Sequence, residues 1–293
     1  MEGVMMTLYE EVRAALGSAH FTPRKKLGQN FLVHENVIAS ILRLLELSPR
    51  DAVLEIGPGL GFLTRSMVEI AAEVWAVEVD TFLADWLMRS PLGTNPKFHL
   101  LRDDVLKVSL DQWLPARKFK LAANLPYSIS TPVLFRVFDW RACFSSLVLM
   151  VQKEVADRIA AKPGTKAYGT LSVWCQAHGR VTDKVSVAPE AFVPRPDVRS
   201  TVLKIELYEK PLVAADEVPL LRGLVRAAFG QRRKTLRNAL SSWLNQDREA
   251  IAGFLRSQEI DPRRRGETLS VDEFIKLGRS LKPLAPRPAA KNG

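Results

Sequence analysis

Val53-Leu54-Glu55-Ile56-Gly57-Pro58-Gly59-Leu60-Gly61 is an apolar run that leads directly into a glycine-rich turn. The run predicts a buried strand, and the glycines let the backbone approach a ligand closely at the start of the next helix, where N–H groups are free. The glycine spacing does not match the G-x-G-x-x-G fingerprint, and no Lys-Ser/Thr pair completes a Walker A loop. The stretch therefore indicates a ligand site but weakens the case for a nicotinamide or nucleoside-triphosphate enzyme.

Apolar runs alternate with helical patterns on both sides of this stretch. A helix is expected at about 35–47, and strands are expected at 52–56, 73–79, 98–102, 119–123 and 146–151. Such alternation predicts a parallel sheet with right-handed crossovers. Two further strands, at 181–188 and 200–208, have no helical crossover between them, which predicts an antiparallel hairpin at the sheet edge. The expected fold class is α/β with a seven-stranded, mostly parallel sheet.

Acidic residues follow two of the predicted strands. Glu78 ends the second strand, where its carboxylate could accept hydrogen bonds from ribose hydroxyls. Asp103 and Asp104 follow the third strand, where a carboxylate could accept from an adenine amino group. A single acid at such a position is more often a solvated strand end. Together with the glycine turn, however, the acids predict a nucleoside site at the carboxyl edge of the sheet.

The fourth predicted strand ends at Asn124-Leu125-Pro126-Tyr127, a sequence suited to presenting an exocyclic amine to a methyl donor. The lone pair of such an amine is delocalised into its ring, so an activating site must accept hydrogen bonds from both N–H groups. Asn124 can accept one, the backbone carbonyl beside Pro126 can accept the other, and Tyr127 offers a flat face for the base. The alternative is an ordinary turn, since Asn and Pro are common there.

This ordered set resembles the class I S-adenosylmethionine-dependent methyltransferases, which have a Rossmann-like fold, and in particular their adenine-N6 branch. Five other segments are similar to the small-subunit enzymes of the rRNA adenine N6-methyltransferase family: Arg24–Leu32, Gln152–Val155, Lys166–Gly169, Phe192–Ser200 and Phe229–Thr235. The resemblance covers about residues 21–277. It implies N6,N6-dimethylation of two adjacent adenosines in the 3′-terminal hairpin of small-subunit (16S) rRNA, late in 30S assembly.

The same resemblance implies roles for individual residues. It implies that S-adenosyl-L-methionine contacts Asn30, Leu32, Gly57, Glu78, Asp104 and Asn124. It implies that the catalytic residues are Asn124, Pro126, Tyr127 and Phe192, with Tyr127 and Phe192 holding the target base. The implied partner is rRNA within the assembling 30S particle, bound by a monomer, and no metal is implied.

The chain carries 42 Lys and Arg against 32 Asp and Glu, a formal charge of +10 with a pI near 9.7. Such an excess favours a polyanionic partner through counterion release. Three basic clusters lie at the edges of helical patterns: Arg24–Lys26, Arg232-Arg233-Lys234 with Arg237, and Arg263–Arg265. A solvated helix face explains many short basic runs. Taken together with an adenine pocket, however, these clusters favour contacts with RNA phosphates.

The patterns also predict how the chain is divided. Residues 1–20 form an N-terminal extension, 21–211 the catalytic domain, 212–282 a small helical rRNA-binding domain, and 283–293 a disordered tail.

Cys143 and Cys175 have no metal-binding spacing, and neither lies in a Pro-Cys loop that could supply a thiolate nucleophile. No run approaches ~18 apolar residues and the N-terminus lacks a leader pattern, so a cytoplasmic location without membrane contact is expected.

Three alternatives remain open. The first is the related large-subunit rRNA methyltransferase that confers macrolide resistance, although Leu125 and the segments at 166–169 and 231–235 favour the small-subunit enzyme. The second is an assembly factor for which methylation is secondary. The third is a transcription-associated relative that binds nucleic acid. The complete set of expected cofactor residues argues against a protein that only binds nucleic acid and transfers no methyl group.

Overall fold

The computed structural model describes residues 6–18, 23–24, 27–231 and 233–281. Lys25, Lys26, Arg232 and the predicted tail at 283–293 therefore lie outside the described residues. The described chain forms two compact units. One holds the chain up to Ala156 together with Arg180–Leu207, and the other holds Asp157–Gly179 and the chain from Tyr208 onward.

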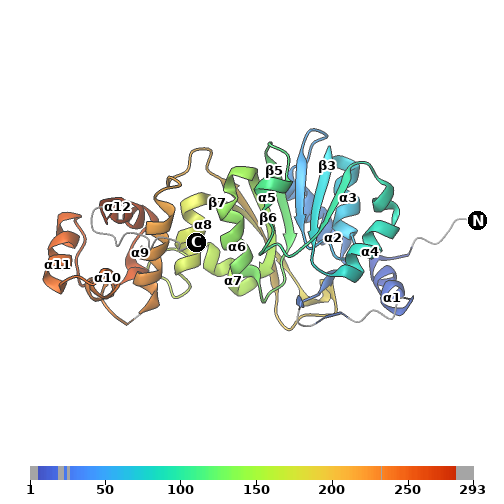
Figure 1. The fold of residues 1–293 in the computed structure, drawn as a ribbon. Coiled ribbons are helices and arrows are strands. Elements are labelled where there is room, and N and C mark those ends of the chain that lie inside the picture. The colour runs from blue at the N-terminus through green and yellow to red at the C-terminus, as the bar shows by residue number, and fades with distance from the viewer. Residues whose placement is uncertain (1–5, 19–22, 25–26, 232, 282–293) are drawn as a thin grey trace, which may run out of the picture. The chain divides into compact units, whose positions relative to one another are not determined.

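The first unit is built on a seven-stranded sheet (Figure 1). Its strand order is β4-β3-β2-β5-β6-β9-β7. The first five strands in this order pair in parallel, and β9 pairs antiparallel with β6. The strands are β2 (Ala52–Ile56), β3 (Glu73–Glu78), β4 (Phe98–Arg102), β5 (Phe119–Asn124), β6 (Phe144–Gln152), β7 (Gly179–Val187) and β9 (Ser200–Leu207). Each predicted strand is present, and the predicted α/β class is confirmed.

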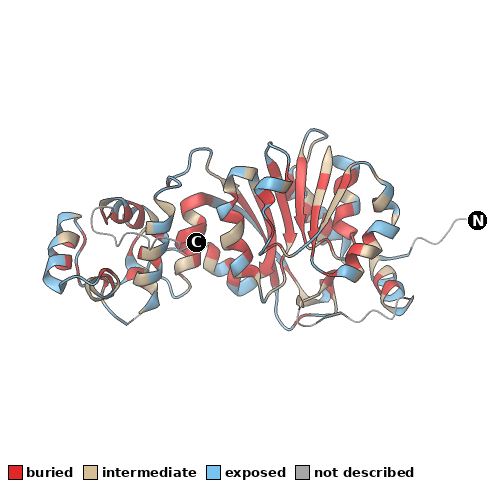
Figure 2. Cartoon of the chain, in the orientation of Figure 1, coloured by how far each residue is buried: buried red, intermediate tan, exposed pale blue. Residues whose placement is uncertain are grey.

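The sheet positions a ligand crevice at its centre. The chain runs from β2 outward to β3 and β4, and then returns to the other side of β2 to form β5. Connections therefore leave β2 and β5 in opposite directions, which opens a crevice at the carboxyl ends of these two strands. All five residues of β2 are buried, and Figure 2 shows the central strands buried along most of their length. This burial accounts for the apolar run that the sequence carries there.

The helices and short 3-10 turns of this unit precede, connect or follow its strands. They are α1 (Leu8–Ser18), α2 (Glu35–Leu45), α3 (Phe62–Ile70), α4 (Thr81–Arg89), η2 (Pro91–Thr94), α5 (Leu110–Trp113), α6 (Ser130–Asp139), η3 (Arg141–Cys143), α7 (Lys153–Ile159) and η4 (Pro189–Ala191). Helix α1 belongs to the predicted N-terminal extension. It buries Val12 and Ala15, and its Glu11 forms an ion pair with Arg65 of α3 at 2.8 Å.

A second, two-stranded sheet lies outside the main one. Strand β1 (Phe31–Leu32) pairs antiparallel with β8 (Phe192–Val193), so that Leu32 lies opposite Phe192 and Phe31 opposite Val193. Strands of two residues carry no periodicity, which is why the sequence patterns do not predict them. The pairing joins the segment before α2 to the segment before β9.

The second unit is helical. It contains α8 (Thr170–His178), α9 (Val218–Gly230), α10 (Leu236–Leu244), α11 (Arg248–Ser257), η5 (Gly266–Thr268) and α12 (Val271–Leu281). Thr235 caps α10 and Asp247 caps α11 through side-chain hydrogen bonds to backbone N–H groups. Helix α9 buries Leu221, Leu224, Val225 and Ala228, and α10 buries Leu236, Ala239, Leu240 and Leu244.

The boundary of this unit differs from the one predicted at residue 212, because Asp157–Gly179 packs with the C-terminal helices. Tyr168 meets Phe229 of α9 edge-on with ring centroids 5.9 Å apart, and the Arg222 guanidinium lies 4.9 Å from the ring centroid of Trp174. The sequence patterns place residues 157–179 between two strands of the sheet, and they do not reveal these long-range contacts.

Candidate active site

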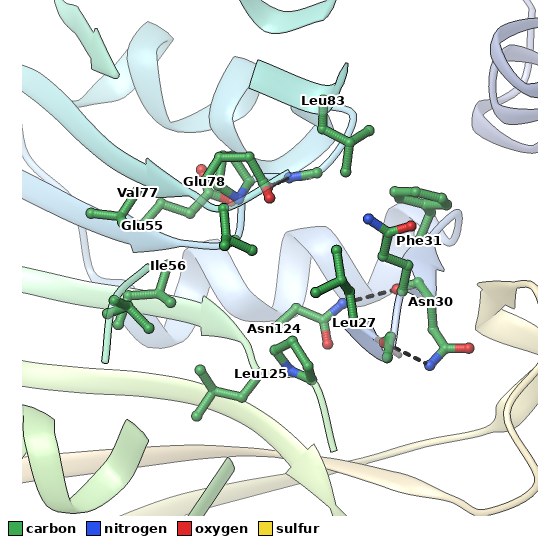
Figure 3. Close-up of a pocket in the computed structure, with 18 of the residues that line it drawn as sticks. Leu27, Asn30, Phe31, Glu55, Ile56, Val77, Glu78, Leu83, Asn124 and Leu125 are labelled. Carbon is green, nitrogen blue, oxygen red and sulfur yellow. Dashed lines mark hydrogen bonds between the residues drawn. The ribbon is translucent and has the colours of Figure 1, made fainter. Parts of the chain in front are cut away.

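A cavity opens at the carboxyl ends of β2, β3 and β5 and beside the loop after β4 (Figure 3). The loop at 27–32 and the start of α3 complete its wall. The cavity brings together eight of the residues expected to bind the cofactor or act in catalysis: Asn30, Leu32, Gly57, Glu78, Asp104, Asn124, Pro126 and Tyr127. Phe192 is the expected site residue that does not line it.

The glycine turn after β2 approaches the cavity with its backbone. Gly57, Gly59 and Gly61 have φ angles of 70°, 60° and 82°, a region that side chains with a Cβ adopt at a cost. A Cβ at Gly59 would lie 3.3 Å from the Phe31 ring. The turn therefore requires glycine both for its conformation and for its close approach to the loop at 27–32.

Glu78 is held at the end of β3 by two backbone N–H groups. Its Oε2 accepts from the N–H of Gly59 at 3.2 Å, and its Oε1 accepts from the N–H of Asp80 at 2.9 Å. Its side chain is buried, and burial raises its pKa despite these hydrogen bonds. The carboxyl group is fixed in place and keeps lone pairs for a ligand, as expected for an acceptor of ribose hydroxyls.

Glu55 is a second buried acid on the cavity wall, and the sequence patterns do not assign it a role. It is 3% exposed, and its Oε2 accepts from Thr64 Oγ1 at 2.6 Å. Burial raises the pKa of Glu55 to about 7, and the nearby charge of Glu78 acts in the same direction. A signal for it does exist in the sequence. An acid inside the apolar run at 52–56 has to be buried, and buried acids cluster at functional sites.

Residues after β3 and β4 form another part of the wall. Asp104 is half-buried, and its Oδ1 accepts from the N–H of Leu106 at 2.9 Å. Val79 also lines the cavity and is 46% exposed, an unusual state for a large apolar side chain that directly follows a buried strand. The arrangement offers an apolar surface beside a carboxylate, which suits an adenine ring with its amino group.

Asn124 at the end of β5 is oriented by the loop at 27–32 (Figure 3). Its Nδ2 donates to the backbone carbonyl of Asn30 at 3.2 Å, and Asn30 Nδ2 in turn donates to the carbonyl of Gly28 at 3.2 Å. A carbonyl can only accept, so the Asn124 amide nitrogen must face Asn30. Asn124 Oδ1 is then the acceptor that remains for a ligand.

The turn after Asn124 fixes a second acceptor. The Pro126 carbonyl is engaged by the N–H of Ile129 at 3.1 Å and by Ser130 Oγ at 2.9 Å. The carbonyl beside Pro126 that is expected to accept from an amine is therefore that of Leu125. Gly28 packs directly on this turn, since a Cβ there would lie 3.1 Å from Pro126 Cβ.

The two aromatic residues expected to hold a base differ in placement. Tyr127 lines the cavity and is half-buried, and its hydroxyl lies 2.6 Å from Ser200 Oγ. Phe192 is 2% exposed and packs in the core of the first unit, opposite Leu32. It presents no free ring face here, so its stacking on a base stays a prediction.

The basic clusters are only partly available for phosphates. Arg233 and Lys234 are exposed, whereas Arg237 forms an ion pair with Glu249 at 3.0 Å. Arg264 is engaged by both oxygens of Glu273 and by Thr268. Arg263 is exposed but pairs with Asp261 at 3.2 Å. Arg264 therefore serves the packing of the second unit rather than a ligand.

Comparisons with known proteins agree with this geometry. The family model for ribosomal RNA adenine dimethylase matches residues 20–277. The chain belongs to this family. A relative from Geobacter metallireducens, named ribosomal RNA small subunit methyltransferase A, is 46% identical over 265 residues, 89% of this chain and 96% of the relative. A Clostridium botulinum protein of the same name is 42% identical over 258 residues, 88% of this chain and 93% of its own length.

Solved structures are similar as well. A dimethyladenosine transferase from Plasmodium falciparum has a TM-score of 0.75 at 26% identity, covering 86% of this chain and 98% of that chain. The 23S rRNA methyltransferase ErmE has a TM-score of 0.64 at 23% identity, covering 86% of this chain and 99% of that chain. This similarity shows a shared fold.

No helix in the described ranges is long and apolar enough to span a bilayer. Within those ranges, no group of three or more His, Cys, Asp or Glu residues could hold a metal ion.

Proposed function

We propose that the protein transfers methyl groups from S-adenosylmethionine to adenine N6 in small-subunit rRNA, and that it forms N6,N6-dimethyladenosine. The proposed targets are two adjacent adenosines in the 3′-terminal hairpin loop of 16S rRNA. The observation that carries the proposal is the hydrogen bond from Asn124 to the Asn30 carbonyl, which leaves Asn124 Oδ1 as an acceptor on the cavity. Membership of the family and the names of the relatives support the substrate.

The cavity fits S-adenosylmethionine. Glu78 would accept from the ribose hydroxyls, Val79 and Asp104 would contact the adenine, and the backbone of the glycine turn would lie against the cofactor. Asn30 and Leu32 would contact it from the loop at 27–32. When bound, this cofactor supplies an electrophilic methyl group on a sulfonium sulfur.

The chain's own residues would prepare the amine for attack. Asn124 Oδ1 and the Leu125 carbonyl would each accept one N–H of the adenine amine, which draws its lone pair out of the ring. Tyr127 would stack on the base, an interaction typically worth about 1–3 kcal/mol. The nitrogen becomes acidic as it gains a methyl group, so its proton can leave to water. No strong base is needed, and among the described residues that line the cavity none is His, Lys or Arg.

The proposed partner is rRNA within the assembling 30S particle, bound by a monomer in the cytoplasm. The formal charge of +10 and the exposed Arg233 and Lys234 support binding to a polyanion. The helices from residue 212 to 282 are proposed to hold the rRNA, together with the basic residues at 232–237.

The test is to incubate the protein with labelled S-adenosylmethionine and undermethylated small subunits, and then to map the labelled nucleotides. Label on two adjacent adenosines of the 3′-terminal hairpin is expected. Large subunits serve as the matched control substrate. Label that appears on large-subunit RNA instead would favour the macrolide-resistance type of enzyme.

An assembly role without essential chemistry is the second candidate, and the exposed basic residues keep it open. A variant that binds small subunits but cannot transfer methyl groups separates the two. If this variant rescues the phenotype of a deletion strain, occupancy of the subunit is the main role. If it fails to rescue, methyl transfer is required.

A further inference from the structure

Tyr127 is anchored at its far end by a residue that belongs to a distant part of the chain. Its hydroxyl lies 2.6 Å from Ser200 Oγ, 73 positions later in the sequence. Ser200 is 0% exposed and is the first residue of β9, where it pairs with Gln152 of β6. Next to this pair, the N–H of Lys153 donates to the Arg199 carbonyl at 2.9 Å. The backbone of Ser200 is therefore held in place by the sheet.

The other end of Tyr127 is fixed by its turn. Pro126 precedes it, and the Pro126 carbonyl holds the first turn of α6 through Ser130. The ring thus spans from the turn that carries Asn124 to the start of β9. The turn still allows the tyrosine more than one side-chain rotamer, and the bond to Ser200 favours the one that the structure shows.

We propose that Ser200 is a positioning residue which, by holding Tyr127, supports the second methyl transfer more than the first. This inference rests on the proposed function. In the first transfer, two N–H groups of the amine can be held, one by Asn124 and one by the Leu125 carbonyl. In the second transfer, N6 carries one methyl group and one hydrogen. Only one of the two acceptors can then be used, so the orientation of the base depends more on the stacked ring.

Loosening Tyr127 should therefore slow the second transfer more than the first. A neutral hydrogen bond of this kind typically contributes a factor of about five. Ser200→Ala should lower the single-turnover rate of the second transfer about fivefold more than that of the first, so that N6-monomethyladenosine accumulates. A role limited to folding would lower both rates together.

The experiment follows both products by mass spectrometry of nucleosides from undermethylated small subunits under single-turnover conditions. Ser200→Cys is the matched control for size, since a thiol nearly fills the space of the hydroxyl but bonds weakly. Ser200→Ala and Ser200→Cys should shift the product ratio alike. Tyr127→Phe keeps the ring and removes the other hydroxyl, so it should give the same shift. S-adenosylmethionine affinity should stay unchanged in all three.

The decisive measurement is the double variant Tyr127→Phe/Ser200→Ala. If Ser200 acts through the Tyr127 hydroxyl, the double variant should have the product ratio of either single variant. Additive effects, or an unchanged ratio in Tyr127→Phe, would overturn the proposal even if Ser200→Ala proved unstable. If the unmodified protein forms no methylated adenosine, the proposed function itself fails. Dimethylation with a ratio that no variant changes refutes this inference alone.

Discussion

Gln29 Nε2 donates to Asp80 Oδ2 at 2.8 Å, and this bond ties the cavity-lining loop at 27–32 to the end of β3. Asp80 is 0% exposed, and its other oxygen caps α4 by accepting from the N–H groups of Phe82 and Leu83. Arg24 approaches the same carboxylate at 3.5 Å. One buried carboxylate thus holds the loop that orients Asn124 beside the strand that carries Glu78.

Removing this tie should weaken cofactor binding. Gln29→Ala deletes the donor while Asp80 keeps its bonds to α4, so the fold should persist while the loop at 27–32 is held less firmly at the end of β3. We expect S-adenosylmethionine affinity to fall by at most about 1.5–3 kcal/mol, the range typical for a hydrogen bond to a charged group. Titration calorimetry measures this. Gln112→Ala, at an exposed position of α5, is the matched control and should bind normally. Equal affinities of the two variants would remove the role assigned to Gln29.

Asn124→Ala should abolish turnover while the fold stays intact. The change removes an acceptor aimed at the reacting amine, a loss that typically lowers the rate by about 10²–10³. Methylation of small subunits under single-turnover conditions measures it, and circular dichroism checks the fold. Near wild-type rates would show that Asn124 is not the amine acceptor.

Glu55 should make stability depend on pH. Burial raises the pKa of Glu55 from its ordinary value of 4.5 to about 7. Between these two values the unfolded chain releases the proton while the folded protein keeps it, so stability falls as pH rises through this window. Below pH 4.5 Glu55 is protonated in both the folded and the unfolded state, so no stability is lost. Above pH 7 the loss is complete and amounts to at most about 3 kcal/mol.

Glu55→Gln removes this dependence, because an amide does not titrate. Its Oε1 can still accept from Thr64. The unfolding free energy of the variant relative to the natural protein should therefore rise from pH 4 to pH 8. Urea unfolding at several pH values measures it. A difference that stays flat across this range would contradict the raised pKa.

The sequence predicts local features of the fold better than distant contacts. The run at 52–56 and its glycine turn specify a strand and a ligand loop by themselves, and Asn124 follows from the chemistry of its own turn. The bond between Tyr127 and Ser200 depends on β9 lying beside β6, which no local pattern reveals. Phe192 is a second case in which a distant contact decides the outcome. Its motif suggests that it holds a base, but the pairing of its strand with β1 buries it.

The exposed pair Arg233 and Lys234 tests how the second unit binds RNA. If they grip phosphates, changing both to Gln should weaken binding to small subunits. It should also flatten the slope of log affinity against log salt by about 0.7–0.9 for each phosphate that is no longer neutralised. Cofactor affinity should persist. Thermal stability should change little, because Leu236 and Leu240 of α10 remain buried and Thr235 still caps the helix.

The matched control for this pair is Arg256→Gln/Lys276→Gln, which removes the same charge from exposed positions of α11 and α12. A smaller change of slope in this control would show that the effect belongs to the site at 233–234 and not to net charge. An unchanged slope in the Arg233/Lys234 variant would show that these residues lie at a solvated helix edge and do not contact phosphates. Recognition of rRNA would then rest on the catalytic unit or on Arg265, the exposed member of its cluster for which the described residues provide no acidic partner.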